Sequence, residues 1–200
     1  MFVSSLKNRR MRRVALFFGS FNPIHIGHLA LGNYVAEFGG VDEVRFVVSP
    51  HNPLKERGGL MDDEFRLEMV RRAIEGYPKF GVSDVEFRLP KPSYTYDTLT
   101  FMSQEEPDVK FVLIMGGDNL DLFRKWRNYD KIMEQYEVLV YPRPDSSNEV
   151  PDDYKNVSVI DAPLIEVSST FIRESLRDGK DVRFFMPQGV AEMMSQNSFL

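Results

Sequence analysis

Short apolar runs alternate along this sequence with stretches of helical spacing, and this alternation limits the folds available to the chain. The runs typical of strands are residues 13–18, 43–48, 82–87, 110–115, 138–141 and 157–160. Helical patterns cover residues 27–38, 62–75, 129–135 and 168–178, and a further helix is expected to begin near Tyr96. Strands that alternate with helices predict parallel pairing. We therefore expect an α/β protein with a Rossmann-like open parallel sheet and helices on both faces. In such sheets ligands bind beyond the carboxyl ends of the strands.

The composition excludes several classes of function. The chain has 200 residues, of which 42% are hydrophobic and 28% charged, so one domain over residues 12–200 is expected. A net charge of −5 argues against nucleic acid as a partner, because no general positive field neutralises phosphates. Disulfides and thiolate chemistry are excluded because there is no cysteine. No stretch is apolar for long enough to span a membrane, so we expect no membrane partner. A cytoplasmic location is expected and is compatible with the lack of cysteine.

Residues 1–11 are expected to form a flexible leader ahead of this domain. Five of the seven residues 7–13 are basic, a composition that also fits a targeting or nucleic-acid-binding tail. Met11 lies just before the first expected strand and could be an alternative start. The sequence leaves the oligomeric state open, and a homo-oligomer is compatible with it.

The most informative stretch is residues 19–28, Gly-Ser-Phe-Asn-Pro-Ile-His-Ile-Gly-His, which joins the first expected strand to the next helix. Gly19 permits a tight turn, Ser20 offers a hydroxyl and an amide, and the helix start supplies unpaired N–H groups. His25 and His28 are three residues apart, so both rings can lie on one side of a helical turn and donate to phosphate oxygens. Core or capping histidines are the alternative, and a zinc site would need a third ligand at a recognisable spacing. The stretch favours a triphosphate site.

A second candidate for anion binding is the stretch of residues 167–173, Val-Ser-Ser-Thr-Phe-Ile-Arg. Ser168, Ser169 and Thr170 are typical of helix starts, where hydroxyls and free N–H groups form an anion pocket. Arg173 lies one turn further along the same side and could bind the same anion. An ordinary helix cap followed by a solvated arginine would explain the same residues.

The two stretches resemble the two signatures of the nucleotidyltransferase superfamily, Gly-x-Phe-x-Pro-x-His-x-Gly-His and Ile-Ser-Ser-Thr-x-Ile-Arg, in the same order and about 140 residues apart. The resemblance extends from Arg12 to about Met194 and is strongest to the bacterial nicotinate-nucleotide adenylyltransferases. It implies His25, His28 and Arg173 as catalytic residues. The ATP contacts that it implies are Gly19, Ser20, Phe21, His25, His28, Gly116, Asp118, Ser168, Ser169, Thr170 and Arg173.

The resemblance also implies contacts to a second substrate. Lys55 ends a loop after the second strand that reads Ser-Pro-His-Asn-Pro-Leu-Lys, where the family has a Pro-Pro-His-Lys type of loop. The family histidine is therefore missing or moved to His51, and Lys55 is the candidate for a phosphate contact, with an idle surface lysine as the alternative. Thr95 resembles a threonine at the nicotinate ring, and Trp126 resembles a tryptophan that stacks on that ring.

Simpler structural explanations exist for the residues outside the two signatures. Thr95 could be a residue near a helix start without a ligand, and Trp126 could pack against a neighbouring helix. Gly116 and Asp118 follow the strand 110–115 in a pattern that, in the family, places a carboxylate near ribose hydroxyls. Asp118 could otherwise cap a helix.

The implied reaction joins ATP and nicotinate mononucleotide, releases pyrophosphate, and gives nicotinate adenine dinucleotide, a precursor of NAD. Direct in-line attack on the α-phosphorus is expected, with Mg²⁺ bridging the ATP phosphates and no protein metal site. Other superfamily members carry the same signatures and remain alternatives: adenylyltransferases for nicotinamide mononucleotide, pantetheine phosphate or FMN, and cytidylyltransferases. An inactive nucleotide-binding regulatory module is an alternative of another class. Residues 25–28 also resemble the class I aminoacyl-tRNA synthetase signature, but the Lys-Met-Ser-Lys-Ser loop is absent and no anticodon domain would fit.

Overall fold

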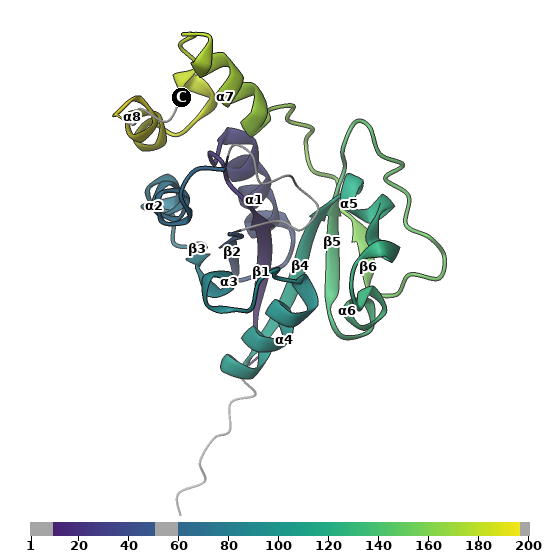
Figure 1. Cartoon of the computed structure of the whole chain (residues 1–200). Helices are drawn as coiled ribbons and strands as arrows, with labels where there is room; N and C mark the ends of the chain where they lie inside the picture. The colour runs from purple at the N-terminus through teal and green to yellow at the C-terminus, as the bar shows by residue number, and fades with distance from the viewer. Residues whose placement is uncertain (1–9, 51–59, 197–200) are drawn as a thin grey trace, which may run out of the picture.

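The centre of the fold is a six-stranded parallel sheet (Figure 1). This is a computed structural model, and it describes residues 10–50 and 60–196. The strands are β1 (Arg12–Gly19), β2 (Glu43–Val48), β3 (Phe80–Ser83), β4 (Val109–Gly116), β5 (Glu137–Tyr141) and β6 (Val157–Val159). Their order is β3-β2-β1-β4-β5-β6. The chain therefore adds β2 and β3 on one side of β1, and then β4, β5 and β6 on the other side. This is the doubly wound Rossmann-like arrangement that the sequence predicts.

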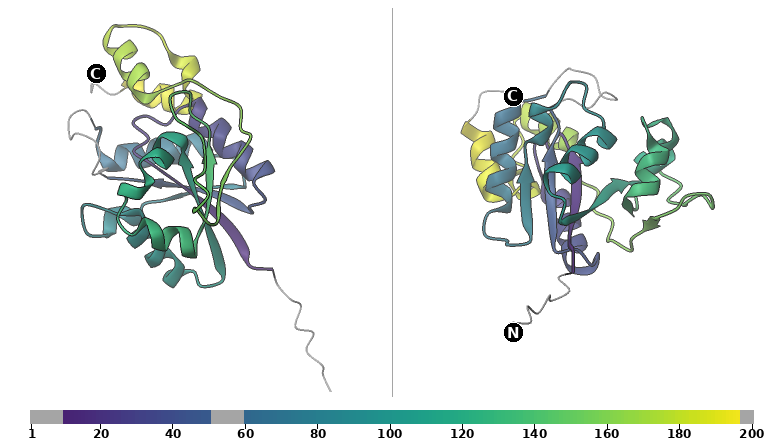
Figure 2. Two further views of the ribbon diagram at one scale, coloured as in Figure 1. Left: turned by 90° about the vertical axis from the view of Figure 1, so that its right-hand side faces the viewer. Right: turned by 90° about the horizontal axis from the view of Figure 1, so that it is seen from below.

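Helices cover both faces of the sheet (Figures 1 and 2). One face carries α1 (Ile26–Phe38), α2 (Asp63–Ile74), α7 (Ser169–Arg177) and α8 (Gln188–Gln196). The other carries α4 (Thr95–Glu105), α5 (Gly117–Asp121) and α6 (Tyr129–Gln135). Shorter helical turns are α3 (Val85–Arg88), η1 (Phe123–Lys125) and η2 (Arg183–Phe185).

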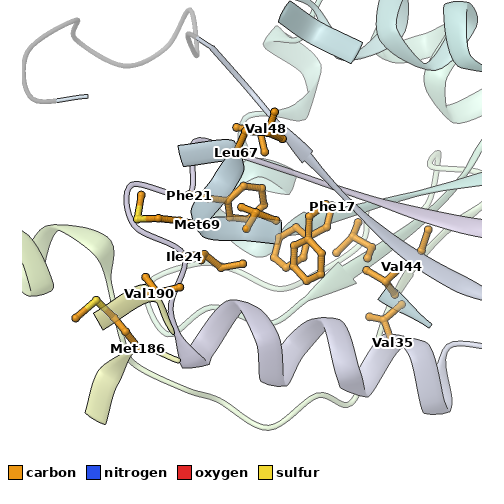
Figure 3. Packing of buried hydrophobic residues seen from close by; sticks show 14 of the residues in the cluster. Phe17, Phe21, Ile24, Val35, Val44, Val48, Leu67, Met69, Met186 and Val190 are labelled. Carbon is orange, nitrogen blue, oxygen red and sulfur yellow. The ribbon is translucent and has the colours of Figure 1, made fainter. Parts of the chain in front are cut away.

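The strands divide the apolar side chains into two cores. Along β1, Ala15 and Phe17 join the core under α1 and α2, whereas Val14 and Leu16 join the core under α4 and α6. Strands buried on both faces need apolar residues at every position, which explains the continuous apolar runs in the sequence. Figure 3 shows the first core, where Phe21 from the loop after β1 packs near residues of α2.

One strand prediction was wrong at its carboxyl end. The pattern of residues 82–87 predicts a strand, but β3 ends at Ser83 and α3 begins at Val85. The Ser83 hydroxyl accepts a hydrogen bond from the Val85 N–H at 3.2 Å, and the Phe87 N–H donates to the Asp84 carbonyl at 2.8 Å. These local bonds offer the backbone a helical turn in place of the sheet ladder. The helices α5 and α8 were not predicted, and α8 packs against α2.

The ends of the chain are only partly described. Of the expected leader, the structure describes Arg10 and Met11, and Arg10 lies 3.3 Å from the Asp42 carboxylate. Across residues 10–50 and 60–196, no helix combines the length and the apolar character needed to cross a membrane.

Candidate active site

Two adjoining cavities, of about 540 Å³ and about 370 Å³, open at the carboxyl ends of β1 and β4. The chain leaves β1 toward β2 and leaves β4 toward β5, on opposite sides, so a crevice forms between the two strand ends. The two cavities share a wall that consists of Phe17, Phe18, Gly19, Ser20, Asn119 and Tyr141. A ligand that filled both cavities would therefore pass over the end of β1.

The larger cavity brings the two signature stretches together. Every expected ATP contact except Gly116 lines it: Gly19, Ser20, Phe21, His25, His28, Asp118, Ser168, Ser169, Thr170 and Arg173. Gly116 lines the smaller cavity instead. The stretches also touch directly, because the Ser169 hydroxyl donates to the Pro23 carbonyl at 2.9 Å and Arg173 Nη1 donates to the Asn22 carbonyl at 2.7 Å.

Two helices begin at the larger cavity. Gly27 and His28 in the first turn of α1, and Ser169 and Thr170 in the first turn of α7, are part of its lining. Ser168 caps α7 by accepting a hydrogen bond from the Phe171 N–H at 3.1 Å, as the sequence predicts. Each helix start contributes unpaired N–H groups and the positive end of a helix dipole, so the cavity suits an anion.

The two signature histidines stack on each other at the start of α1. Their ring centroids are 3.7 Å apart with planes inclined by 28°. His25 is the N-cap residue of α1 and is 5% exposed, and its buried Nδ1 has no hydrogen-bond partner within the described residues. Both rings line the larger cavity, and they also cap the helix as the alternative reading of the sequence expected, because His25 is its N-cap residue and His28 Nδ1 accepts the His25 backbone N–H.

Hydrogen bonding and burial set the protonation of this pair. The His25 backbone N–H donates to His28 Nδ1 at 3.3 Å, which requires an unprotonated Nδ1 and leaves the proton of a neutral ring on Nε2. Burial and, to a smaller extent, the nearby Arg143 charge together lower the pKa of His25 from 6.5 to about 4. At neutral pH His25 is therefore an uncharged imidazole.

The loop after β1 turns at Phe21 and not at Gly19. Phe21 has φ 44°, in the left-handed region that non-glycine residues rarely occupy. Gly19 is required for a different reason, because a Cβ there would lie 2.8 Å from the Phe21 ring. The prediction that Gly19 makes the tight turn was therefore wrong, and the role of glycine at this position is to leave room for the Phe21 ring.

Arg173 both holds the loop and borders the cavity. Besides its bond to Asn22, Nη2 donates to the Thr170 hydroxyl at 3.3 Å, and its buried Nε has no partner within the described residues. Burial lowers the pKa of Arg173 from its ordinary value, and the charge of Arg177 acts in the same direction. The guanidinium remains charged at any physiological pH.

The lining of the smaller cavity combines aromatic and apolar residues with nearly as many polar or charged ones. Thr95 and Trp126 are both part of it, as are the cations Lys125 and Arg127. The Trp126 ring packs edge-on against the Phe123 ring, with the ring centroids 5.5 Å apart, as the packing alternative expected. Trp126 also lines the smaller cavity. Its buried Nε1 has no partner within the described residues.

The remaining site predictions concern Asp118 and Lys55. Asp118 lies in the first turn of α5 and its carboxylate is 3.7 Å from Arg143. Gly116 is the N-cap of α5, so the alternative in which Asp118 caps the helix is wrong. Lys55 lies outside the described residues, as does His51.

Among the cavity-lining residues that sequence reasoning missed, three have a charge or a shifted pKa that bears on the site. Arg143 lines the larger cavity, and Glu86 lines the smaller one with a pKa that burial raises above its ordinary value. Tyr141 borders both, and burial raises its pKa to about 12. Tyr141 and Arg143 lie at and just after the end of β5, so the rule that ligands bind at carboxyl strand ends could have found them.

Comparison with known proteins identifies the family. The model of the cytidylyltransferase-like family matches residues 16–175. A protein of Bacteroides fragilis named "Probable nicotinate-nucleotide adenylyltransferase" is 51% identical over 93% of this chain and 92% of its own length. A protein of the same name from Cytophaga hutchinsonii is 49% identical over 94% of this chain and 97% of its own length. This chain belongs to the nicotinate-nucleotide adenylyltransferase family.

The fold is shared with solved members of this class of enzyme. The nicotinic acid mononucleotide adenylyltransferase of Plasmodium falciparum, solved in complex with NaAD, superposes with a TM-score of 0.76 over 94% of this chain and 97% of that chain. The two sequences are 16% identical. Membership of the adenylyltransferase family and the Rossmann-like fold, both expected from the sequence, are thus confirmed.

Acid should destabilise the protein partly through His25. In the unfolded chain the imidazole takes up a proton near pH 6.5, whereas in the folded protein it stays neutral until about pH 4. Between these values the unfolded state binds more protons, so the free energy of unfolding falls as the pH is lowered through this window. Above pH 6.5 both states are neutral at this ring and the effect vanishes.

Urea unfolding at pH 7 and pH 5 measures this contribution. The free energy of unfolding of the parent should drop between these pH values by about 2 kcal/mol more than that of His25→Asn, which has no titrating ring. Equal drops in parent and variant would contradict a lowered pKa at His25.

Proposed function

We propose that this adenylyltransferase binds ATP in the larger cavity and nicotinate mononucleotide in the smaller one, and joins them over the end of β1. The observation that carries this proposal is the wall at Gly19 and Ser20 that the two cavities share. An α-phosphate held there would face a phosphate that enters from the smaller cavity. The products are nicotinate adenine dinucleotide and pyrophosphate, and the NaAD complex of the Plasmodium falciparum enzyme supports this assignment.

The charges and dipoles of the larger cavity support the triphosphate. Arg143 and Arg173 both line it, and the helices α1 and α7 begin there. The arginine guanidinium and the helix starts both prefer phosphate oxygens. Asp118, in the first turn of α5 and part of the lining of the same cavity, is proposed to bind ribose hydroxyls. The proposed ATP contacts are those that line this cavity, with Gly116 at the border to the smaller one.

The smaller cavity supports the pyridine nucleotide. Trp126 offers an aromatic face, Thr95 offers polar groups at the start of α4, and both line the cavity. Lys125 and Arg127 give the lining a positive character that favours a carboxylate over an amide. Burial raises the pKa of Glu86, which also lines this cavity, above its ordinary value. Lys55 remains a candidate for the mononucleotide phosphate.

The chemistry is one in-line displacement. A phosphate oxygen of the mononucleotide forms a bond to the α-phosphorus of ATP, and the bond from that phosphorus to the bridging oxygen of pyrophosphate breaks. No protein nucleophile takes part. His28 donates from Nε2 to the reacting phosphate, Arg173 stabilises the leaving pyrophosphate, and neutral His25 supports the His28 ring by stacking.

Mg²⁺ is proposed to enter with ATP as part of the substrate. Within residues 10–50 and 60–196, no group of three or more His, Cys, Asp or Glu side chains could form a metal cage. Mg²⁺ commonly binds through substrate phosphates with one or two protein carboxylates, and Asp118 and Glu166 line the larger cavity. The ion would offset phosphate charge.

We further propose that residues 12–200 act as one domain, because the site draws on elements from β1 to α7 and α8 belongs to the same core.

A panel of mononucleotides tests the proposed substrate. With ATP and Mg²⁺, pyrophosphate release should be fastest with nicotinate mononucleotide, at a kcat/KM at least about tenfold above nicotinamide mononucleotide, because the amide leaves charged donors poorly matched. Pantetheine phosphate and FMN serve as controls for the rest of the superfamily. Equal rates with the acid and the amide would overturn the nicotinate assignment.

Replacement of His28 tests the proposed catalytic donor. His28→Ala should lower kcat by roughly a hundredfold or more, with a smaller effect on ATP binding, because a donor aimed at the reacting phosphate acts most strongly in the transition state. Steady-state kinetics and calorimetric ATP titration separate the two effects, and a melting curve checks the fold. A folded variant with kcat within a few-fold of the parent would remove His28 from the mechanism.

Replacement of Trp126 tests which substrate occupies the smaller cavity. Trp126→Ala should raise KM for nicotinate mononucleotide by about tenfold and leave KM for ATP nearly unchanged, since stacking contributes about 0.5–1.5 kcal/mol beyond area burial. Trp126→Phe is the matched control, because it retains an aromatic face and should show a smaller change. A defect confined to ATP would move Trp126 to the adenine side.

A further inference from the structure

Arg66 is a fully buried cation in α2 that lines neither cavity. Its side chain is 0% exposed, which is rare for arginine because a buried charge is costly unless it is well paired. The carboxylate that it contacts is Asp63, one turn earlier in α2, at 2.5 Å. Its other hydrogen bonds all go to backbone carbonyl groups. A residue that serves only the apolar core does not need this set of donors.

The four carbonyl groups belong to three separate segments. Arg66 Nη1 donates to Ser20, in the loop after β1, and to Ser49, after β2, the latter at 2.9 Å. Nη2 donates to Pro50 at 3.4 Å, and Nε donates to Met61, just before α2, at 3.1 Å. The planar guanidinium therefore fixes the ends of two neighbouring strands relative to each other and to α2.

The hydrogen bond from Arg66 to the Ser20 carbonyl fixes the orientation of the Ser20–Phe21 peptide group. The Ser20–Phe21 peptide is trans, so its C=O and N–H point in opposite directions. The C=O points into the protein toward Arg66. The N–H of Phe21 must therefore point the other way, away from Arg66, and Phe21 is one of the residues that line the larger cavity. Within the described residues, no protein acceptor receives this N–H.

The backbone at Phe21 needs such support. A non-glycine residue with φ 44° is strained by roughly 1–2 kcal/mol, and a loop keeps such a conformation only where its surroundings impose it. On one side the buried ring of Phe21 packs against Phe17, Phe46 and His28. On the other side the carbonyl of the preceding residue is held by Arg66.

We propose that Arg66 is a positioning residue, which turns the Ser20–Phe21 peptide so that the Phe21 N–H is presented to the reacting phosphate of the nucleotide. This inference rests on the proposed function, because it takes the larger cavity as the triphosphate site. Arg66 touches no substrate itself. It acts by fixing the geometry of the loop at the junction of the two cavities.

Conservative and isosteric replacements of Arg66 test this role. Arg66→Lys keeps the charge but cannot span all four carbonyl groups, and Arg66→Met keeps much of the volume without donors. Arg71→Lys, at a half-exposed position of the same helix, is the matched control. Arg66→Lys should lower kcat by about tenfold to a hundredfold with KM for either substrate changed less than about threefold, because misplacement of a reacting group acts on the transition state.

A structural role alone predicts a different outcome. It would lower the melting temperature of Arg66→Lys while the folded enzyme kept the kcat of the parent and of Arg71→Lys, and this result would overturn the proposal. A rise in KM for ATP with unchanged kcat would also overturn it. Rates of the parent and the variants are compared with the mononucleotide that the parent uses best. If the substrate assignment is wrong, the parent itself shows it, and the effect of the Arg66 variants can still be measured.

A measurement on the parent keeps the test decisive if the variants do not fold. In protein labelled with ¹⁵N-phenylalanine, the nonreactive analogue α,β-methylene ATP should shift the Phe21 amide resonance and slow its hydrogen exchange. Phe38, which is 74% exposed at the far end of α1, provides the reference amide. A Phe21 amide that responds no more than that of Phe38 would contradict the proposed orientation.

Discussion

The reversal of strand order between β1 and β4 is the constraint on which the rest of the site depends. Because the chain leaves these neighbouring strands in opposite directions, a crevice forms between their carboxyl ends, and the two cavities lie there. Residues that follow different strands, and that are far apart in the sequence, therefore lie close together at this edge of the sheet. Gly19 and Ser20 come from the end of β1, Gly116 and Asp118 from the end of β4, and the helix starts of α1 and α7 close the same space.

The electrostatics of the larger cavity come from fixed donors and few free charges. His25 is held neutral by burial, while the positive groups at the cavity are guanidinium groups and helix starts. This arrangement suits a reaction that only shifts charge among phosphate oxygens, since fixed dipoles need no reorganisation during the displacement. Arg66 extends the same principle one layer deeper, because its contact with the Ser20 carbonyl turns a backbone dipole toward the phosphate.

The sequence predicted which segments form strands and which residues line the cavities better than it predicted how those residues are arranged. Apolar periodicity located all six strands, and it failed only where Ser83 and Asp84 form local bonds that end β3 early. Motif spacing indicated His25 and His28 but not their stacking, which depends on the cap geometry of α1. Arg143 and Arg66 left no recognisable motif, because one is a single residue after a strand and the other lies in an ordinary amphipathic helix.

What the sequence by itself determined is local: which segments form strands or helices, and which short stretches carry anion-binding groups at a helix start. These properties depend on neighbours within a few residues, so they can be read from spacing. Only the tertiary structure decided that the two signatures touch through Ser169 and Arg173, and that Trp126 and Thr95 share a second cavity. It also decided that His25 is neutral and that Phe21, not Gly19, makes the turn. Burial, long-range contact and backbone strain arise from parts of the chain far apart in sequence, and local spacing carries no information about them.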